Sequence, residues 1–390
     1  MFSSVQNGRA LGSMIFARVV YALNWMNVGA IFYLMSSDLN AGVSGLGNVT
    51  AAFYLGIGLL QIPGGLLTAK WGPKRVVVIG IFVSSFSALG TSAVSNISEM
   101  AVLRFLVGSG MAFVFAPGIV IIARLLRGGK SGMGVGLFNS AYDLGGLVAL
   151  FGWVVVATVT GWRASLALSG AIGVATGVLA LLFVPGEKTG TGLTASAGPL
   201  LNILRDRRLI LIGLAMLGFD IGNTIIPGFM ILYLVNKVSV SGTLAGLVTS
   251  LVVVIPIFAA LWAGRAYDRI SRHRVIMVLA VLASAASLAI GAYPSIYAAV
   301  ACAALGGVVA GVGYTFAFAG ARDFNREGAE YEGLAISWVN SIHLTGSVIP
   351  PVLFASLVES LGYPQAWLWS GALTLLFVVP VLLLAARWGR

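Results

Sequence analysis

Twelve apolar runs, each long enough to cross a membrane, constrain this chain more than any other feature. They cover residues 11–36, 46–69, 75–95, 100–124, 132–158, 162–184, 208–235, 242–263, 275–293, 295–319, 333–358 and 364–386. A membrane-spanning helix needs about 20 apolar residues, whereas a lipid-facing β-barrel would show alternating segments of about ten. Only 9% of the residues are charged, against about a quarter in soluble domains. We therefore expect an all-α polytopic membrane protein.

The loops between these runs differ sharply in charge. Of the 23 Lys and Arg residues, Arg163 and Lys237 fall in one set of loops, Arg18 and Arg104 lie inside runs, and the rest fall in the other set. The positive-inside rule then places both termini in the cytoplasm, and an even number of spans requires both termini on one side. We expect the protein in a cell or plasma membrane. The net charge of +11 follows from this topology, and we expect no nucleic-acid partner.

A cationic loop between two apolar runs occurs twice, about two hundred residues apart. The matched positions are Gly65 with Gly264, Ala69 with Asp268, Lys70 with Arg269, and Arg75 with Arg274. Three further pairs keep the same register: Gly108-x-Gly110 with Gly311-x-Gly313, Asn139-Ser140 with Asn340-Ser341, and Tyr33 with Tyr233. We predict two pseudo-symmetric six-helix bundles, over residues 1–184 and 208–390, joined by a flexible cytoplasmic linker at 185–207.

Two six-span halves with a central linker resemble the major facilitator superfamily. The first loop is similar to that family's Gly-x-Leu-x-Asp-Lys/Arg-x-Gly-x-Lys/Arg signature, with Gly65, Leu67, Lys70, Gly72, Lys74 and Arg75 in place and Ala69 at the usual aspartate. The second copy keeps the acid as Asp268, followed by Arg269. The resemblance implies a gating role for both loops. The fifth-span motif of drug/proton antiporters is incomplete, since Ala141-Tyr142 replaces Gly-Pro.

Two carboxylates fall deep inside spans. Asp143 and Asp220 each lie about twelve residues from a loop, which is close to the bilayer midplane. Charged groups there are costly and mark functional sites by default. We therefore predict that both couple transport to protons, and a structural ion pair is the alternative. His343, inside span 11, joins them as a relay candidate, with a packed neutral imidazole as its alternative.

Two arginines lie within the apolar runs. Arg104 could pair with Asp143, bind an anionic substrate group, or donate to the backbone of span 1. Arg18 lies nearer the cytoplasmic end of span 1, so we expect its side chain to snorkel to the lipid headgroups. His273, in a basic loop, is expected to be solvated.

Polar side chains gather at similar depth on spans 1, 5, 7 and 11, which with spans 2, 4, 8 and 10 surround the central cavity in the resembled fold. Helical spacing places Asn24 with Asn27, and Asn340 with His343, on shared faces. We predict a central cavity whose substrate-binding residues are Asn24, Asn27, Arg104, Asn139, Asn223, Tyr314 and Asn340. Hydrogen bonds between helices are the alternative role for each residue.

No enzyme motif is present. The sequence lacks clustered metal ligands, a phosphate-binding Gly-Lys-Ser/Thr loop and a paired nucleophile and base, so we expect neither a cofactor nor a metal. The combined features predict a monomeric secondary transporter that moves a small organic solute by alternating access, with proton symport favoured. Proton-coupled efflux of a drug or cation is one alternative. A transporter-like receptor or a lipid-moving protein is another.

Overall fold

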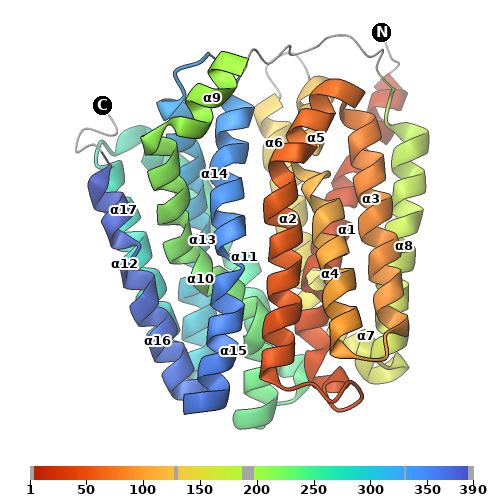
Figure 1. Cartoon of the computed structure of the whole chain (residues 1–390), viewed down its shortest axis with the longest axis vertical. Helices are drawn as coiled ribbons and strands as arrows, with labels where there is room; N and C mark the ends of the chain where they lie inside the picture. Colours follow the sequence, from red (N-terminus) through yellow and green to blue (C-terminus); the bar gives the residue numbers. More distant parts are fainter. Residues whose placement is uncertain (1–3, 127–130, 187–196, 329–330, 385–390) are drawn as a thin grey trace.

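The twelve predicted spans are present as helices in the computed structural model, which describes residues 4–126, 131–186, 197–328 and 331–384. Within these residues, 12 helices are long and apolar enough to cross a membrane. They form two bundles side by side, with the start of α1, the end of α17 and α9 at the same end of the molecule (Figure 1). The predicted fold class is therefore confirmed.

The N-terminal bundle contains α1 (Ser4–Met35), α2 (Val43–Trp71), α3 (Pro73–Gly90), η1 (Thr91–Ala93), α4 (Ile97–Ala112), α5 (Phe115–Leu125), α6 (Ser131–Leu147), the π-helix η2 (Val148–Gly152), α7 (Trp153–Thr160) and α8 (Trp162–Phe183). The C-terminal bundle contains α10 (Arg207–Lys237), α11 (Gly242–Arg269), α12 (His273–Gly291), α13 (Ile296–Phe324), α14 (Glu332–Gly346), α15 (Ile349–Leu361), α16 (Tyr363–Leu375) and α17 (Val378–Leu383). The helix α9 (Ala197–Arg205) lies between them in sequence.

Proline explains two of the interruptions within spans. The fourth span breaks between α4 and α5, just before Pro117, and the eleventh breaks between α14 and α15, just before Pro350. Because proline lacks an N–H group, it fits the first turn of a helix but not its interior. By contrast, α10 continues through Pro227. Its other turns are almost completely buried against neighbouring helices, which compensates for the lost hydrogen bond.

Repeated glycines give the two bundles the same internal packing. Gly108 on α4 lies so close to α2 that a Cβ atom there would be 2.1 Å from the carbonyl oxygen of Phe53. The matching Gly311 on α13 lies equally close to α11, where a Cβ atom would be 2.6 Å from that of Ala259. The duplicated glycines therefore set the same helix pairing in both halves.

The linker is partly ordered where the structure describes it. Residues 187–196 of the predicted linker lie outside the described residues, as do the basic residues Arg127, Lys130, Lys188, Arg387 and Arg390 used to assign orientation. The remainder includes the helix α9, whose Ile203 is buried in the core of the C-terminal bundle. Asn202 on α9 also donates to Glu327. This part of the linker is therefore docked on the C-terminal bundle, contrary to the flexible chain we expected.

The halves contact each other most closely away from the cationic loops. We call the end with the α2–α3 and α11–α12 turns the basic end. At the other end, α2 lies beside α15 (Figure 1), and a Cβ atom on Gly47 would be 2.7 Å from that of Ala355. Nearby, Glu359 accepts a hydrogen bond from the Ser44 N–H at 3.0 Å. The bundles are therefore closed together at the end opposite the basic end.

Candidate functional site

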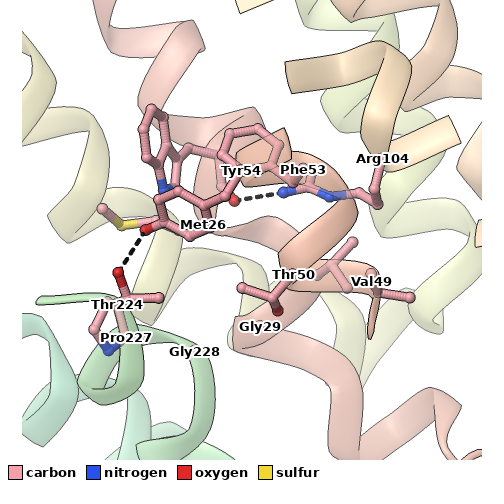
Figure 2. Close-up of a pocket in the computed structure, with 12 residues that line it drawn as sticks. Met26, Gly29, Val49, Thr50, Phe53, Tyr54, Arg104, Thr224, Pro227 and Gly228 are labelled. Carbon is pink, nitrogen blue, oxygen red and sulfur yellow. Dashed lines mark hydrogen bonds between the residues drawn. The ribbon is translucent and has the colours of Figure 1, made fainter. Parts of the chain in front are cut away.

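A small cavity marks the junction of the two halves. It is lined by residues of α1, α2 and α4 from one half and of α10 from the other, and it has a volume of about 40 Å³. Figure 2 shows Tyr54 and Arg104 on one side of it and Thr224 and Pro227 on the other. A cavity of this size holds a few water molecules at most. The halves are thus nearly in contact here, and Thr224 donates to the Tyr54 hydroxyl across the junction at 3.2 Å.

Asp220 on α10 is the centre of a buried polar network in the C-terminal half. Its side chain is 2% exposed and accepts hydrogen bonds from the hydroxyls of Tyr314 and Ser347. His343 Nδ1 lies 3.5 Å from one carboxylate oxygen. The two predicted proton-coupling residues Asp220 and His343 therefore lie together, and a protonated His343 would form an ion pair with the carboxylate.

Three predicted substrate-binding residues belong to the same network. Asn223 donates to the Tyr314 hydroxyl at 3.0 Å, and His343 Nε2 lies 2.9 Å from Asn340 Oδ1. The contact with Asn340 therefore orients the His343 ring. These side chains come from α10, α13 and α14, so three helices are joined around one acid. Ser347, one turn beyond His343, was missed by the sequence analysis, although its i, i+4 spacing could have identified it.

Arg104 does not pair with Asp143. Its guanidinium donates to the carbonyls of Asn24 and Trp25 at 2.7 and 2.8 Å, and to Asn27 Oδ1 at 3.1 Å. Of the three roles expected for Arg104, the one observed is hydrogen bonding to the backbone of span 1. These contacts occupy both terminal nitrogens of the guanidinium and tie α4 to α1.

Asn24 and Asn27 face the interior of the N-terminal bundle. Ser169 on α8 donates to Asn24 Oδ1 at 2.5 Å and accepts from Asn27 Nδ2 at 3.0 Å. Both asparagines are at most 2% exposed. In this conformation they join α1, α4 and α8 rather than lining the cavity, which corresponds to the alternative role of hydrogen bonding between helices.

Arg18, expected to lie at the lipid headgroups, is instead buried within the N-terminal bundle. The snorkelling interpretation is wrong, because the side chain is only 6% exposed. Its Cζ atom lies between 4.4 and 5.1 Å from the ring centroids of Tyr21, Phe115, Phe138 and Tyr142. Neither Nε nor Nη1 has a hydrogen-bond partner among the described residues. We call Arg18 and these four aromatic residues the arginine box.

Asp143 lies beside the arginine box and apart from Asp220. It is half-buried on α6, next to Tyr142, and its carboxyl group interacts electrostatically with Arg18. It forms neither a hydrogen bond nor an ion pair within 4.0 Å with any described residue. Asn139, one turn earlier, is exposed. The two predicted proton-coupling acids therefore occupy different halves.

A chain of aromatic contacts connects the two acidic regions. The Trp25 ring lies 5.8 Å from that of Tyr142 and 5.7 Å from that of Tyr54, and Tyr54 contacts Thr224, which lies one turn from Asp220. A helical face of α1 that carries Arg18, Tyr21 and Trp25 at i, i+3 and i+7 builds this connection. That spacing is visible in the sequence and could have indicated that Arg18 points inward.

The predicted gating residues lie at the basic end. Gly65 and Lys70 are near the end of α2, Gly72 connects α2 to α3 with φ of +83°, and Arg75 is exposed at the start of α3. Asp268 and Arg269 are exposed at the end of α11. The expectation that His273 is solvated is wrong, because its ring is 4% exposed and stacks on Tyr267 at 3.9 Å. The gating role of both loops stays a prediction.

Comparisons with known proteins agree on one family. The family model described as Major Facilitator Superfamily matches residues 14–229 and 212–389. The chain is 25% identical over 162 residues to a probable sulfoacetate transporter, SauU, of Cupriavidus necator, covering 42% of this chain and 38% of the relative. It is 33% identical over 134 residues to a probable galactarate/D-glucarate transporter, GudP, of Escherichia coli K12, covering 33% and 28%. The matched region thus spans less than two-fifths of either relative.

A solved structure extends the similarity to the whole fold. A mutant of the nucleoside transporter NupG superposes with a TM-score of 0.77 at 14% identity, covering 96% of this chain and 99% of the other. At this identity the agreement concerns the fold alone.

Proposed function

The chain belongs to the Major Facilitator Superfamily, and we propose that it carries a small organic anion across the membrane together with a proton. Members of this family named among its relatives are transporters, so the protein is an integral membrane transporter and not an enzyme. We infer the class of solute and the coupling ion from the arginine box and its neighbours.

The observation that carries the proposal is that two nitrogens of the Arg18 guanidinium, Nε and Nη1, are buried without a hydrogen-bond partner among the described residues. Buried donors without acceptors are costly, and an anion is the ligand that recovers this cost. Carboxylate and sulfonate groups accept strong, charge-assisted hydrogen bonds from a guanidinium. Both terminal nitrogens of Arg104 donate to α1, whereas Nη1 of Arg18 has no acceptor among the described residues, so Arg18 is the better candidate for binding an anion. The relatives named for sulfoacetate and for galactarate or D-glucarate also concern organic anions.

The surroundings of Arg18 favour a particular kind of anion. Its neighbours in the box are four aromatic rings, and Trp25 continues the aromatic surface towards Tyr54. Such walls stabilise apolar and aromatic groups and offer few partners to a polyhydroxylated chain. We therefore expect a solute with one anionic group on an apolar or aromatic body.

Asp143 supplies the coupling to protons. An ionised carboxylate beside the box competes with an anionic solute for Arg18 and repels it, whereas a protonated carboxyl does neither. Solute and proton would then bind together, which is the thermodynamic basis of symport. The same buried cation repels a cationic drug, so the efflux alternative is less favoured. Asp220 and His343 form a second protonatable pair, whose place at the junction suits a role in the movement of the halves.

The direction of access follows from the closed end. The halves contact each other opposite the basic end, and the charge bias of the loops places the basic end in the cytoplasm. On this assignment both termini are cytoplasmic, and the contact between the halves separates the proposed site from the opposite side of the membrane. Rocking of the two bundles about the junction would expose it to the other side.

Uptake into proteoliposomes tests the proposal. We expect uptake of benzoate, a single-charged aromatic anion, when the outside is made more acidic than the lumen, and weaker uptake of sulfoacetate and D-glucarate. Uptake should collapse when a protonophore removes the pH gradient, while counterflow of the same anion persists. Binding of benzoate without any counterflow would instead indicate a receptor. If a panel of solutes were tested and only cations showed counterflow, the assignment of an anionic solute would be refuted.

A further inference from the structure

Two adjoining hollows open on the surface of the N-terminal half at the basic end. They have volumes of about 530 and 420 Å³ and share Lys74 and Gly186 among their lining residues. They lie where the α2–α3 turn meets the last turn of α8. Neither belongs to the arginine box or to the Asp220 network, so the proposed transport function does not account for them.

Three cations line these hollows. Arg9 and Lys74 border one, and Lys74 and Arg75 border the other. No acidic residue is among the described residues of either lining, and none of the three cations forms an ion pair within the described part of the chain. The family signature would place an aspartate in this loop, but this sequence has Ala69 instead. The loop therefore retains positive charge that no described side chain neutralises.

The walls of the hollows are apolar and face outward. Ile79 on α3 is 42% exposed, and Leu181 and Leu182 on α8 are 49% and 67% exposed. They lie near the ends of the spans Pro73–Ala93 and Trp162–Phe183, the depth at which acyl chains give way to headgroups. Trp71, also in the lining and 40% exposed, is typical of this interface. A ligand here meets cations at one end and hydrocarbon-facing side chains at the other.

We propose that these hollows bind one anionic phospholipid, with its phosphate among Arg9, Lys74 and Arg75 and its acyl chains along Ile79, Leu181 and Leu182. Basic pockets between membrane helices near the cytoplasmic surface bind anionic headgroups in this way. Arg9 is held towards the site by Phe183, whose ring centroid lies 6.0 Å from the guanidinium carbon. Since Lys74 and Arg75 belong to the predicted gating loop, the lipid would also restrain the turn between α2 and α3.

Lipid binding by the purified full-length protein tests this directly. Native mass spectrometry and thermal stabilisation would be recorded with phosphatidylglycerol and with phosphatidylcholine of the same acyl chains. We expect retention and stabilisation by phosphatidylglycerol, and roughly fivefold weaker binding for each cation removed. The double variant Lys74→Ala/Arg75→Ala should therefore bind about 25-fold more weakly, while Lys74→Arg/Arg75→Lys should retain binding.

A matched control separates this site from general charge. Arg265→Ala/Arg272→Ala removes two exposed cations from the same end of the other half and should leave the affinity unchanged. Equal binding of phosphatidylcholine, or an equal loss in this control, would overturn the proposal. Full stabilisation by soluble glycerol phosphate would overturn it too, since the site would then recognise a free phosphate. All variants should melt at the same temperature as the wild type without added lipid, because the altered side chains lie at the surface.

Discussion

Replacement of Arg18 is expected to separate anion binding from stability. The guanidinium has two unpartnered nitrogens, Nε and Nη1, and each charge-assisted hydrogen bond contributes about 1.5–3 kcal/mol. Arg18→Met removes both bonds, about 3–6 kcal/mol, and should weaken binding of the transported anion by about 10²- to 10⁴-fold. Arg18→Lys keeps the charge but loses the planar fork. With one bond lost, it should weaken binding by about 10- to 150-fold.

The same change should not lower the melting temperature. Arg18→Met exchanges a buried charge with two unpartnered nitrogens for an apolar side chain of similar length, and this relieves a desolvation cost. The lost cation–π contacts oppose that gain, so we expect the two effects to offset each other largely. Benzoate affinity would be measured by thermal shift and by radioligand binding, with Arg265→Met as the control for loss of a surface cation. Affinity within threefold of wild type in Arg18→Met would refute the assignment of Arg18 to the substrate.

Three further changes test the remaining parts of the mechanism. Asp143→Asn should bind the anion independently of pH between 5 and 8 and lose gradient-driven uptake while keeping counterflow; a pH dependence like that of wild type would exclude Asp143 as the coupling group. Tyr314→Phe removes one hydroxyl donor from buried Asp220 and should destabilise the protein by about 1–3 kcal/mol, measured by thermal unfolding; an unchanged melting temperature would contradict the network. Gly47→Leu should hold the halves apart at the closed end, so that Ser44→Cys reacts faster with an impermeant maleimide; unchanged labelling would mean that this contact does not control closure.

Much of the architecture was predictable because membrane insertion depends on one-dimensional properties. A run of about twenty apolar residues is long enough to span the membrane, and the predicted spans therefore agree closely with the helices. Repeated glycines at fixed spacing indicate the duplication. Depth in the bilayer could be estimated in the same way, and it placed Asp220 and His343 at similar levels. That they are direct neighbours follows from packing among α10, α13 and α14, which sequence spacing alone does not describe.

The two arginines inside spans could not be placed from the sequence in the same way. Distance from a loop gives the depth of a side chain but not the direction in which the helix presents it. Arg18 was assigned to the lipid headgroups on depth alone, whereas the packing of α1 against α5 and α6 turns it inward to the aromatic residues. For Arg104 the correct role was among those considered, because a buried guanidinium needs several acceptors and the nearest are backbone carbonyls.

The contact between the halves has a consequence for turnover. It combines close glycine packing at Gly47 with a few hydrogen bonds, among them Ser44 to Glu359 and Thr224 to Tyr54. Each such bond contributes about 0.5–1.5 kcal/mol net, and helices of both halves also share one buried apolar cluster. A solute that reverses the populations must favour the other state by more than the free energy difference between the two states. A transporter benefits from a contact of intermediate strength between its halves. A stronger contact would trap the solute, and a weaker one would let the gradient dissipate.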